Sequence, residues 1–323
     1  MKYILKTVCF CLALYTATGC SNENEPAALQ GSGAPIVLDA RIEQSPSPSG
    51  RTTITGTDPK TTAWVTGDQV RLEGNATVGT AAGSNQTVDL GPGLYEYQAD
   101  GSWTYTDGGT EPLVWRAATI QASGVFPAFD TRGNEVAAQT FTLGTDQHTA
   151  ALQGCNDFMI ADETEQTETI NDKKIKLTFR HRLAQLAITL ASIGTEYKDL
   201  TVTKVEVLSN TALSGTVWNA PDYIQACGSA AGTKDDIYVA LVAPEKPSVD
   251  SSHPFIKVTL SDNTVVNLSA LPSKLTFEEG KQHTLALHVG HDEITVDAAS
   301  ITIGEWGRNI NVTGDKPGDT DEK

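Results

Sequence analysis

The amino-acid sequence predicts an all-β protein built from two antiparallel β-sandwich domains in series. Thr and Val are abundant, Gly and Asp recur at turn positions, and no segment keeps apolar residues at helical spacing over several turns. The chain of 323 residues is also longer than one hydrophobic core usually holds together. Short strands, frequent turns and this length together favour two sandwiches.

The N-terminus has the order of a secretory signal, with lysines ahead of an apolar run from Val8 to Tyr15. This run is shorter than the roughly 20 residues that span a bilayer. Small residues directly before Cys20 resemble the lipobox of bacterial lipoproteins, so we expect residues 1–19 to be removed and Cys20 to be acylated. An ordinary signal peptide with a chance cysteine is the alternative, because Ala17 stands where the lipobox most often has Leu.

The first strand is expected between Ala34 and Ile42, after a flexible polar spacer at residues 20–34. Apolar and polar residues alternate along it, which predicts one buried face. That face would consist of Ile36, Leu38, Ala40 and Ile42. Prolines and a glycine then keep residues 43–51 out of regular structure, so an exposed tether that ends at Arg51 follows the strand.

The clearest hairpin of the chain runs from Leu94 to Thr106. Aromatic strands flank Asp100 and Gly101, the dipeptide that type I′ turns prefer because both central residues need a positive φ. Further short apolar runs lie at residues 64–72 and 113–129. These pieces are assigned to a first sandwich at residues 52–165.

An acidic stretch from Ala161 to Lys174 has little apolar content and is the expected domain boundary. The second sandwich is assigned to residues 166–313, and the charged residues 314–323 to a disordered tail. The apolar positions change parity between Arg180 and Gln185, which a β-bulge or a short helical turn would absorb. Later strands are expected at residues 202–208, 237–242, 255–268, 284–289 and 301–306.

Charge and cysteine content limit the partners. The formal net charge of −17 argues against a nucleic acid partner, because the field of the protein would repel phosphates. Once the signal is removed and Cys20 is acylated, Cys155 and Cys227 remain as thiols in an oxidising compartment. They could form a disulfide, or they could stay unpaired in different domains.

No motif of an enzyme is recognisable. Residues 228–232 imitate a nucleophile elbow with the wrong spacing, and neither a phosphate-binding Gly loop nor H-E-x-x-H occurs. His283, His288 and His291 lie close in sequence, but the first two point to opposite faces of an extended strand. The sequence therefore predicts no catalytic residues, no metal site and no other cofactor.

Several short motifs follow one another along the chain. They are W-x-x-G-D (Trp64, Gly67, Asp68), Y-x-Y-x-x-D-G-x-W (Tyr95, Tyr97, Asp100, Gly101, Trp103), F-x-H-x-L-A-x-L (Phe179, His181, Leu183, Ala184, Leu186), F-x-x-G (Phe277, Gly280) and I-x-x-W (Ile303, Trp306). In this order, and with the lipoprotein start, they resemble the fimbrillin family, the type V pilins of Bacteroidota surfaces. The resemblance implies two transthyretin-like β-sandwich domains and a structural or adhesive role in a pilus.

The resemblance also implies an assembly mechanism. Fimbrillins are exported as lipoproteins, an extracellular trypsin-like protease cuts them after an arginine, and the N-terminal strand leaves. A strand of another subunit then fills the vacated groove. On this chain residues 35–51 would be the removable segment, with Arg51 as the cleavage site and Arg41 as its rival; a subunit that is never processed is the alternative.

The location and the donor strand are less sharply defined by the sequence. Glu23 and Glu25 resemble the signal that sends lipoproteins of this phylum to the outer face of the outer membrane, although they also suit a plain soluble linker. The family takes its donor strand from the C-terminal region, yet after Trp306 only Ile310 and Val312 are apolar before the acidic tail. The strand at residues 294–303 could serve instead, and a tip or anchor subunit stays open.

A monomeric surface lipoprotein or tip adhesin that binds glycans or proteins of another cell is the second function considered. Trp103 and Tyr105 alternate with polar residues, so one face of their hairpin is aromatic. An exposed face of this kind could stack on sugar rings, whereas aromatic side chains more often fill the core. The two alternatives differ in whether Tyr95, Tyr97, Trp103 and Tyr105 are covered.

Overall fold

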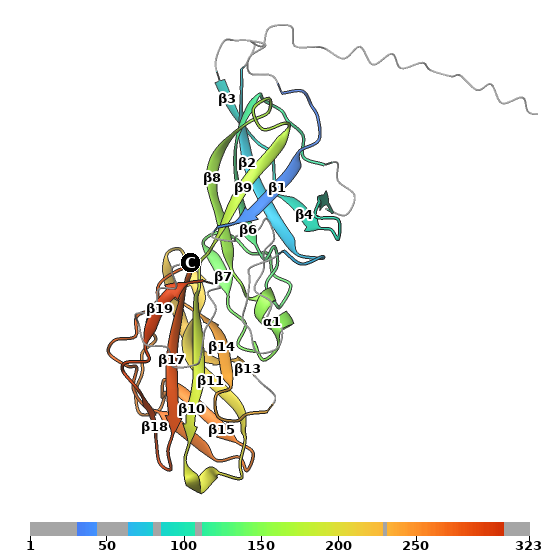
Figure 1. Cartoon of the computed structure of the whole chain (residues 1–323). Coiled ribbons are helices and arrows are strands. Elements are labelled where there is room, and N and C mark those ends of the chain that lie inside the picture. Colours follow the sequence, from blue (N-terminus) through green and yellow to red (C-terminus); the bar gives the residue numbers. More distant parts are fainter. Residues whose placement is uncertain (1–30, 44–63, 80–84, 107–111, 229–230, 307–323) are drawn as a thin grey trace, which may run out of the picture.

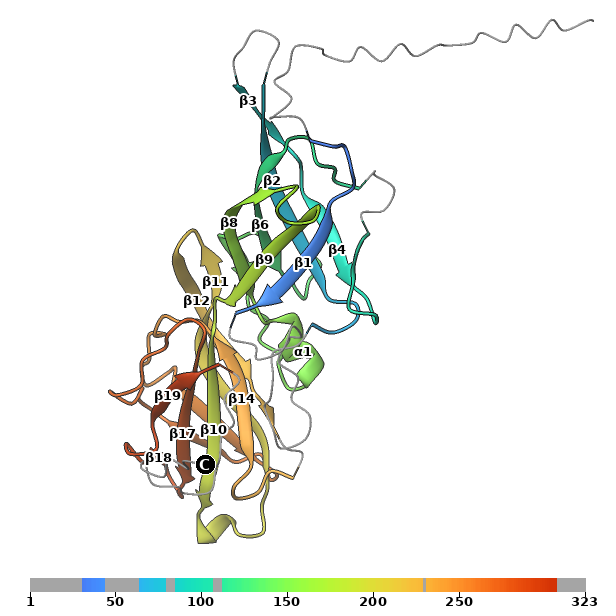
Figure 2. The ribbon, with the colours of Figure 1, turned by 45° about the horizontal axis from the view of Figure 1, so that its top comes forward.

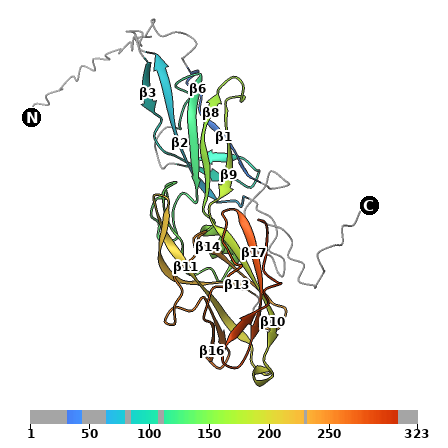
Figure 3. The same cartoon turned by 90° about the vertical axis from the view of Figure 1, so that its left-hand side faces the viewer.

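The computed structural model describes residues 31–43, 64–79, 85–106, 112–228 and 231–306. Within these ranges the chain is almost entirely β-structure, which confirms the predicted fold class. It forms two units that lie end to end, as Figures 1 and 3 show from two sides. The helical segments described are α1 (Ala150–Cys155), near the junction of the units, and a 3₁₀ turn (Thr195–Tyr197).

The N-terminal unit is one eight-stranded sheet that curls around its own core. In spatial order its strands are β1 (Val37–Ile42), β9 (Lys174–His181), β8 (Met159–Thr167), β6 (Thr119–Phe126), β2 (Gln69–Gly79), β4 (Gly93–Tyr97) and β5 (Trp103–Tyr105), with β3 (Asn85–Asp89) paired to β2. The end strands β1 and β5 approach one another, and Figure 2 shows β1 crossing in front beside β9. A single folded sheet thus supplies both layers of this sandwich.

The C-terminal unit has two sheets packed face to face. One contains β13 (Cys227–Gly228), β14 (Ile237–Val242), β10 (Ala184–Ile193), β17 (Lys281–Val289), β18 (Ile294–Val296) and β19 (Thr302–Glu305). The other contains β12 (Val217–Gln225), β11 (Val202–Ser214), β15 (Ile256–Leu260), β16 (Val265–Leu268) and β7 (Thr140–Thr142). Between named strands only β1–β9 and β10–β17 run parallel in the described chain.

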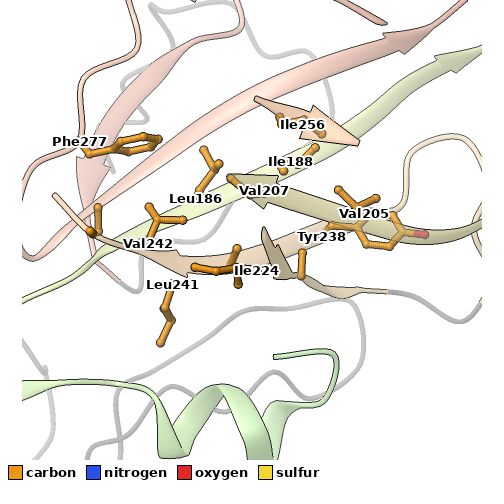
Figure 4. Close-up of a cluster of buried hydrophobic side chains, with 14 of the residues drawn as sticks. Leu186, Ile188, Val205, Val207, Ile224, Tyr238, Leu241, Val242, Ile256 and Phe277 are labelled. Carbon is orange, nitrogen blue, oxygen red and sulfur yellow. The ribbon is translucent and has the colours of Figure 1, made fainter. Parts of the chain in front are cut away.

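The core of the C-terminal unit lies between its two sheets. Figure 4 shows Leu186 and Ile188 of one sheet facing Val207 of the other, while Leu241 points the opposite way, toward α1. The segment around α1 is held against β14, since the buried Gln153 side chain donates to the Val239 carbonyl at 3.0 Å. Most of β14 and the first half of β10 are buried on both faces.

The acidic stretch at residues 161–174 does not separate the two units. It forms most of β8 and the turn to β9, and both strands belong to the first sheet. Its acidic side chains, such as Glu163 and Glu165, occupy the solvent face of a strand, so low apolar content does not mark a linker there. The chain already enters the C-terminal unit at β7 and returns to the first sheet at β8, and it passes finally to the C-terminal unit between His181 and Ala184.

The change of parity after Arg180 has a different cause from either one predicted. Strand β9 ends at His181 in the first sheet, and β10 begins at Ala184 in another sheet. Neither a β-bulge nor a helical turn forms between them. Because the chain changes sheets, the two strands need not share a buried face.

Local geometry corrects the predicted turn type and bears on the cysteine pair that the sequence leaves open. The hairpin at residues 94–106 forms, but of its two central turn residues only Gly101 has a positive φ, of 84°. Gly101 N donates to the Gln98 carbonyl, which describes a type I turn followed by a left-handed glycine. Cys155 is exposed and Cys227 is buried, both as free thiols, so the disulfide considered for this pair is not formed.

Candidate functional site: the β1 slot

Strand β1 is seated with the predicted face inward. Four side chains, three of them large, are at most 6% exposed and belong to the core of the N-terminal unit: Ile36, Leu38, Ala40 and Ile42. On one edge β1 pairs in parallel with β9, in a register that sets Val37 opposite Lys174 and Ile42 opposite Phe179. We call the place that β1 fills the β1 slot, bounded by β9, Trp64, Tyr95 and Leu113.

The other edge of β1 is held mainly by side chains. The indole N–H of Trp64 donates to the main-chain carbonyl of Ala40 at 3.0 Å, and the hydroxyl of Tyr95 donates to that of Ile36 at 3.2 Å. The Ile36 N–H donates to the Leu113 carbonyl at 2.7 Å. One continuous ladder therefore joins β1 to the sheet. Isolated contacts fasten its second edge, and the residues just before β1 pair with residues 113–115 through main-chain hydrogen bonds.

The W-x-x-G-D motif forms the turn that presents Trp64. Asp68 accepts a hydrogen bond from Val65 N at 2.8 Å through its carboxylate, and Gly67 supplies the turn with a φ of 92°. Gly67 N also donates to the Tyr97 carbonyl at 2.9 Å, which ties the turn to β4. These residues explain why Gly and Asp stand at this distance from the tryptophan.

Aromatic rings fix Trp64 in place. Its ring meets those of Trp103, Phe126 and Phe179 edge to face, at centroid distances of 5.0, 5.3 and 5.4 Å. Tyr95 is 1% and Trp103 9% exposed. Tyr97 and Tyr105 are half-buried against the same core, so the aromatic face of the hairpin packs mainly inward behind β1, which weakens the observation that suggested stacking on sugars.

Burial also keeps Tyr95 a hydrogen-bond donor. Desolvation, assisted by the neighbouring Tyr105, raises the pKa of the Tyr95 hydroxyl above its ordinary value. The hydroxyl thus stays protonated across the physiological pH range and continues to donate to the Ile36 carbonyl.

The F-x-H-x-L-A-x-L, F-x-x-G and I-x-x-W motifs contact one another at the junction of the two units. The ring of His181, at the end of β9, stacks on that of Trp306 with centroids 4.0 Å apart and an interplanar angle of 9°. His181 Nδ1 lies 2.7 Å from a carboxylate oxygen of the fully buried Asp157. Gly280 N donates to the Leu183 carbonyl at 2.9 Å, and Gly280 itself has a φ of 66°. Strand β9, which carries β1, therefore ends in a contact with the end of β19.

Comparison with known proteins identifies the family. A family model described as fimbrillin-like matches residues 52–306. The chain belongs to the fimbrillin-like family. No curated protein matches it.

Solved structures share the fold of this fimbrillin-like protein. A candidate cell adhesion protein of Bacteroides uniformis is 16% identical, with a TM-score of 0.51 over 86% of this chain and 100% of its own. One of Bacteroides ovatus is 13% identical, with a TM-score of 0.54 over 85% and 98% of the two chains. Family membership supports a role in a pilus or in cell adhesion at the cell surface.

The other predicted site residues of the fimbrillin-like chain lie apart from one another. Arg41 lies on β1 opposite Thr178, with an exposed side chain. Cys20 and Arg51 lie outside the described residues. Sequence reasoning missed Asp157 and Leu113: a single aspartate in an acidic chain carries no signal, and Leu113 acts through its carbonyl.

The histidines of β17 and its following turn have separate partners. His283 is buried and its Nε2 accepts from Glu278 N at 3.1 Å. His288 Nδ1 lies 2.9 Å from the Ser192 hydroxyl, and His291 is exposed beside Asp292. In the part of the chain that the structure describes, no three His, Cys, Asp or Glu side chains could hold a metal ion, and no helix is long and apolar enough to cross a membrane.

Proposed function

We propose that this fimbrillin-like protein is a non-enzymatic structural or adhesive subunit of a type V pilus that polymerises by strand exchange at the β1 slot. Processing would detach β1, and a strand of another copy would take its place. The seating of β1 is the single observation that carries the proposal. The strand is the first one described, it is deeply buried, and one continuous ladder holds it.

The energetics of the slot favour refilling. Each large inward side chain stabilises the seated strand by about 1.5–3 kcal/mol through burial. Loss of β1 would also expose the unpaired main-chain groups of β9, which form a template for another strand. An incoming strand with the same alternation of apolar residues would recover both contributions.

The export route completes the proposal. Acylation of Cys20 would anchor the subunit at the outer membrane, and Glu23 and Glu25 would direct it to the outer face. The donor segment would follow Trp306 and contain Ile310 and Val312. The rival segment at residues 294–303 contains β18 and is followed directly by the rest of β19, both paired to β17, with Ile294 only 3% exposed. Use of residues 294–303 as a donor would expose the core of the C-terminal unit to water.

Two arginine substitutions test the cleavage step. We expect Arg51→Ala to keep the protein monomeric, because the tether stays intact and β1 refills its own slot. Arg41→Ala is the matched control: Arg41 lies in the ladder with β9, where paired backbone resists a protease, so this variant should polymerise normally. Native mass measurement of the secreted protein distinguishes monomers from polymers. Polymers of Arg51→Ala equal to those of the wild type would contradict the proposal.

A further inference from the structure

We infer that Trp64 and Tyr95 set the register of whichever strand fills the β1 slot, by binding two of its main-chain carbonyls. The inference rests on the proposed function, since it concerns a strand that can be replaced. It adds what the slot recognises: a strand whose inward residues are large, large, small and large. Ala40 marks the small position of this pattern in β1.

The geometry of the two donors measures a fixed length of strand. They bind the carbonyls of Ile36 and Ala40, which are four residues apart in the sequence. Four residues of extended chain span about 13 Å. Both carbonyls point toward the same edge because the strand repeats every second residue. Both donors therefore find a carbonyl only when the inward residues of the strand occupy the positions of Ile36 and Ala40 in the slot.

The chemistry of the contact is independent of the side chains of the strand. Every residue of an incoming strand offers a carbonyl, so a different sequence can satisfy Trp64 and Tyr95 equally well. Both donors are buried, and a buried donor without an acceptor costs about 1–3 kcal/mol. The unpaired donors therefore disfavour an empty or misaligned slot, in addition to the cost of the apolar surface that such a slot exposes.

Side-chain size then excludes the wrong alignments. A shift of one residue turns the polar face inward. A shift of two keeps the apolar face inward but places Leu38 or Ile42 where Ala40 lies, in the buried cluster that also contains Trp64. Three rings surround Trp64 edge to face, so it has no room to withdraw from a larger side chain. Only one alignment satisfies the donors and the small position together.

Peptide exchange on the full-length chain tests the inference. A site-specific protease sequence at residues 45–50 is cut after folding, so β1 stays in place as a non-covalent strand. A fluorescent peptide with the sequence of residues 34–44 is added in excess, and its affinity is measured. We expect Trp64→Phe and Tyr95→Phe each to weaken binding about threefold to tenfold, the effect of one lost hydrogen bond.

Tyr97→Phe is the control for the protein variants. Tyr97 lies on β4 two residues from Tyr95, is half-buried, and makes no hydrogen bond to β1 in the described part of the chain. This variant should bind the peptide as the wild type does. If Trp64→Phe and Tyr95→Phe bind the peptide as tightly as Tyr97→Phe and the wild type do, the inference is overturned.

Peptides with a thioamide in place of one carbonyl test the same contacts in the unmodified protein. Sulfur at residue 40 or 36 should weaken binding about threefold to tenfold, because sulfur is the weaker acceptor. The same change at Leu38, which meets neither donor, should have a smaller effect. The penalty at residue 40 should vanish in Trp64→Phe, as in a double-mutant cycle.

The outcomes separate the two claims. If no peptide enters the wild-type slot, β1 is a permanent strand, and both the proposed function and the register inference fail. If the peptide enters, but the thioamide penalties are the same at residues 36, 38 and 40, the slot is replaceable and only the inference fails.

Discussion

Leu38→Asp is expected to lower the free energy of unfolding by about 3 kcal/mol or more. Leu38 is 4% exposed and lies at the centre of the inward face of β1. The substitution removes a buried leucine and places a carboxylate among apolar side chains, where it has no partner. Because β1 is an end strand, the variant can also avoid the penalty by releasing it, which exposes residues 31–43 to proteases.

Val37→Asp is the matched control for this prediction. Val37 is the neighbouring residue of the same strand, and it is 46% exposed. Its replacement should change the free energy of unfolding by no more than about 0.5 kcal/mol. Denaturant unfolding and limited proteolysis of both variants provide the comparison. Equal stability of the two would show that the inward face of β1 adds little to the fold.

Trp306→Ala should destabilise the C-terminal unit by about 3–5 kcal/mol, the usual range for a buried tryptophan. Trp306 is 6% exposed and covers the ring of His181, which in turn contacts Asp157. The variant opens this buried pair to water and removes the anchor at the end of β19. Amide hydrogen exchange at Thr302–Glu305 should accelerate accordingly.

Ile303→Ala separates this effect from a general weakness of β19. Ile303 lies on the same strand but is 42% exposed, so its truncation should cost less than about 1 kcal/mol. Denaturant unfolding of the two variants measures and compares their free energies of unfolding. A Trp306→Ala variant as stable as Ile303→Ala would mean that the stacked pair at the junction contributes nothing.

The sequence predicted the inward face of β1 because alternation of period two is a local property. Ile36, Leu38, Ala40 and Ile42 are buried as expected, and the later strands fall where their apolar runs lie. The motifs were visible for the same reason, since each is a short local pattern. Their contacts were not predictable: Trp64 meets Phe179 and His181 meets Trp306 only through the topology.

The errors arose where tertiary structure overrides local composition. Residues 161–174 look like a linker, yet they form most of β8, and Glu163 and Glu165 lie on the solvent face of the first sheet. The parity change after Arg180 looked like a defect within one strand, but it marks the passage from one sheet to another. Periodicity indicates which side chains of a strand are buried, but it does not indicate to which sheet the strand belongs.

The N-terminal residue of the assembled protein tests the central claim that β1 is a replaceable strand. The surface-exposed protein is isolated without heating, its mass is measured, and its first residue is determined by mass spectrometry. We predict an N-terminus at Thr52 in a detergent-resistant series of polymers. A monomer that begins at Cys20 and retains residues 36–42 would contradict strand exchange as the function of this slot.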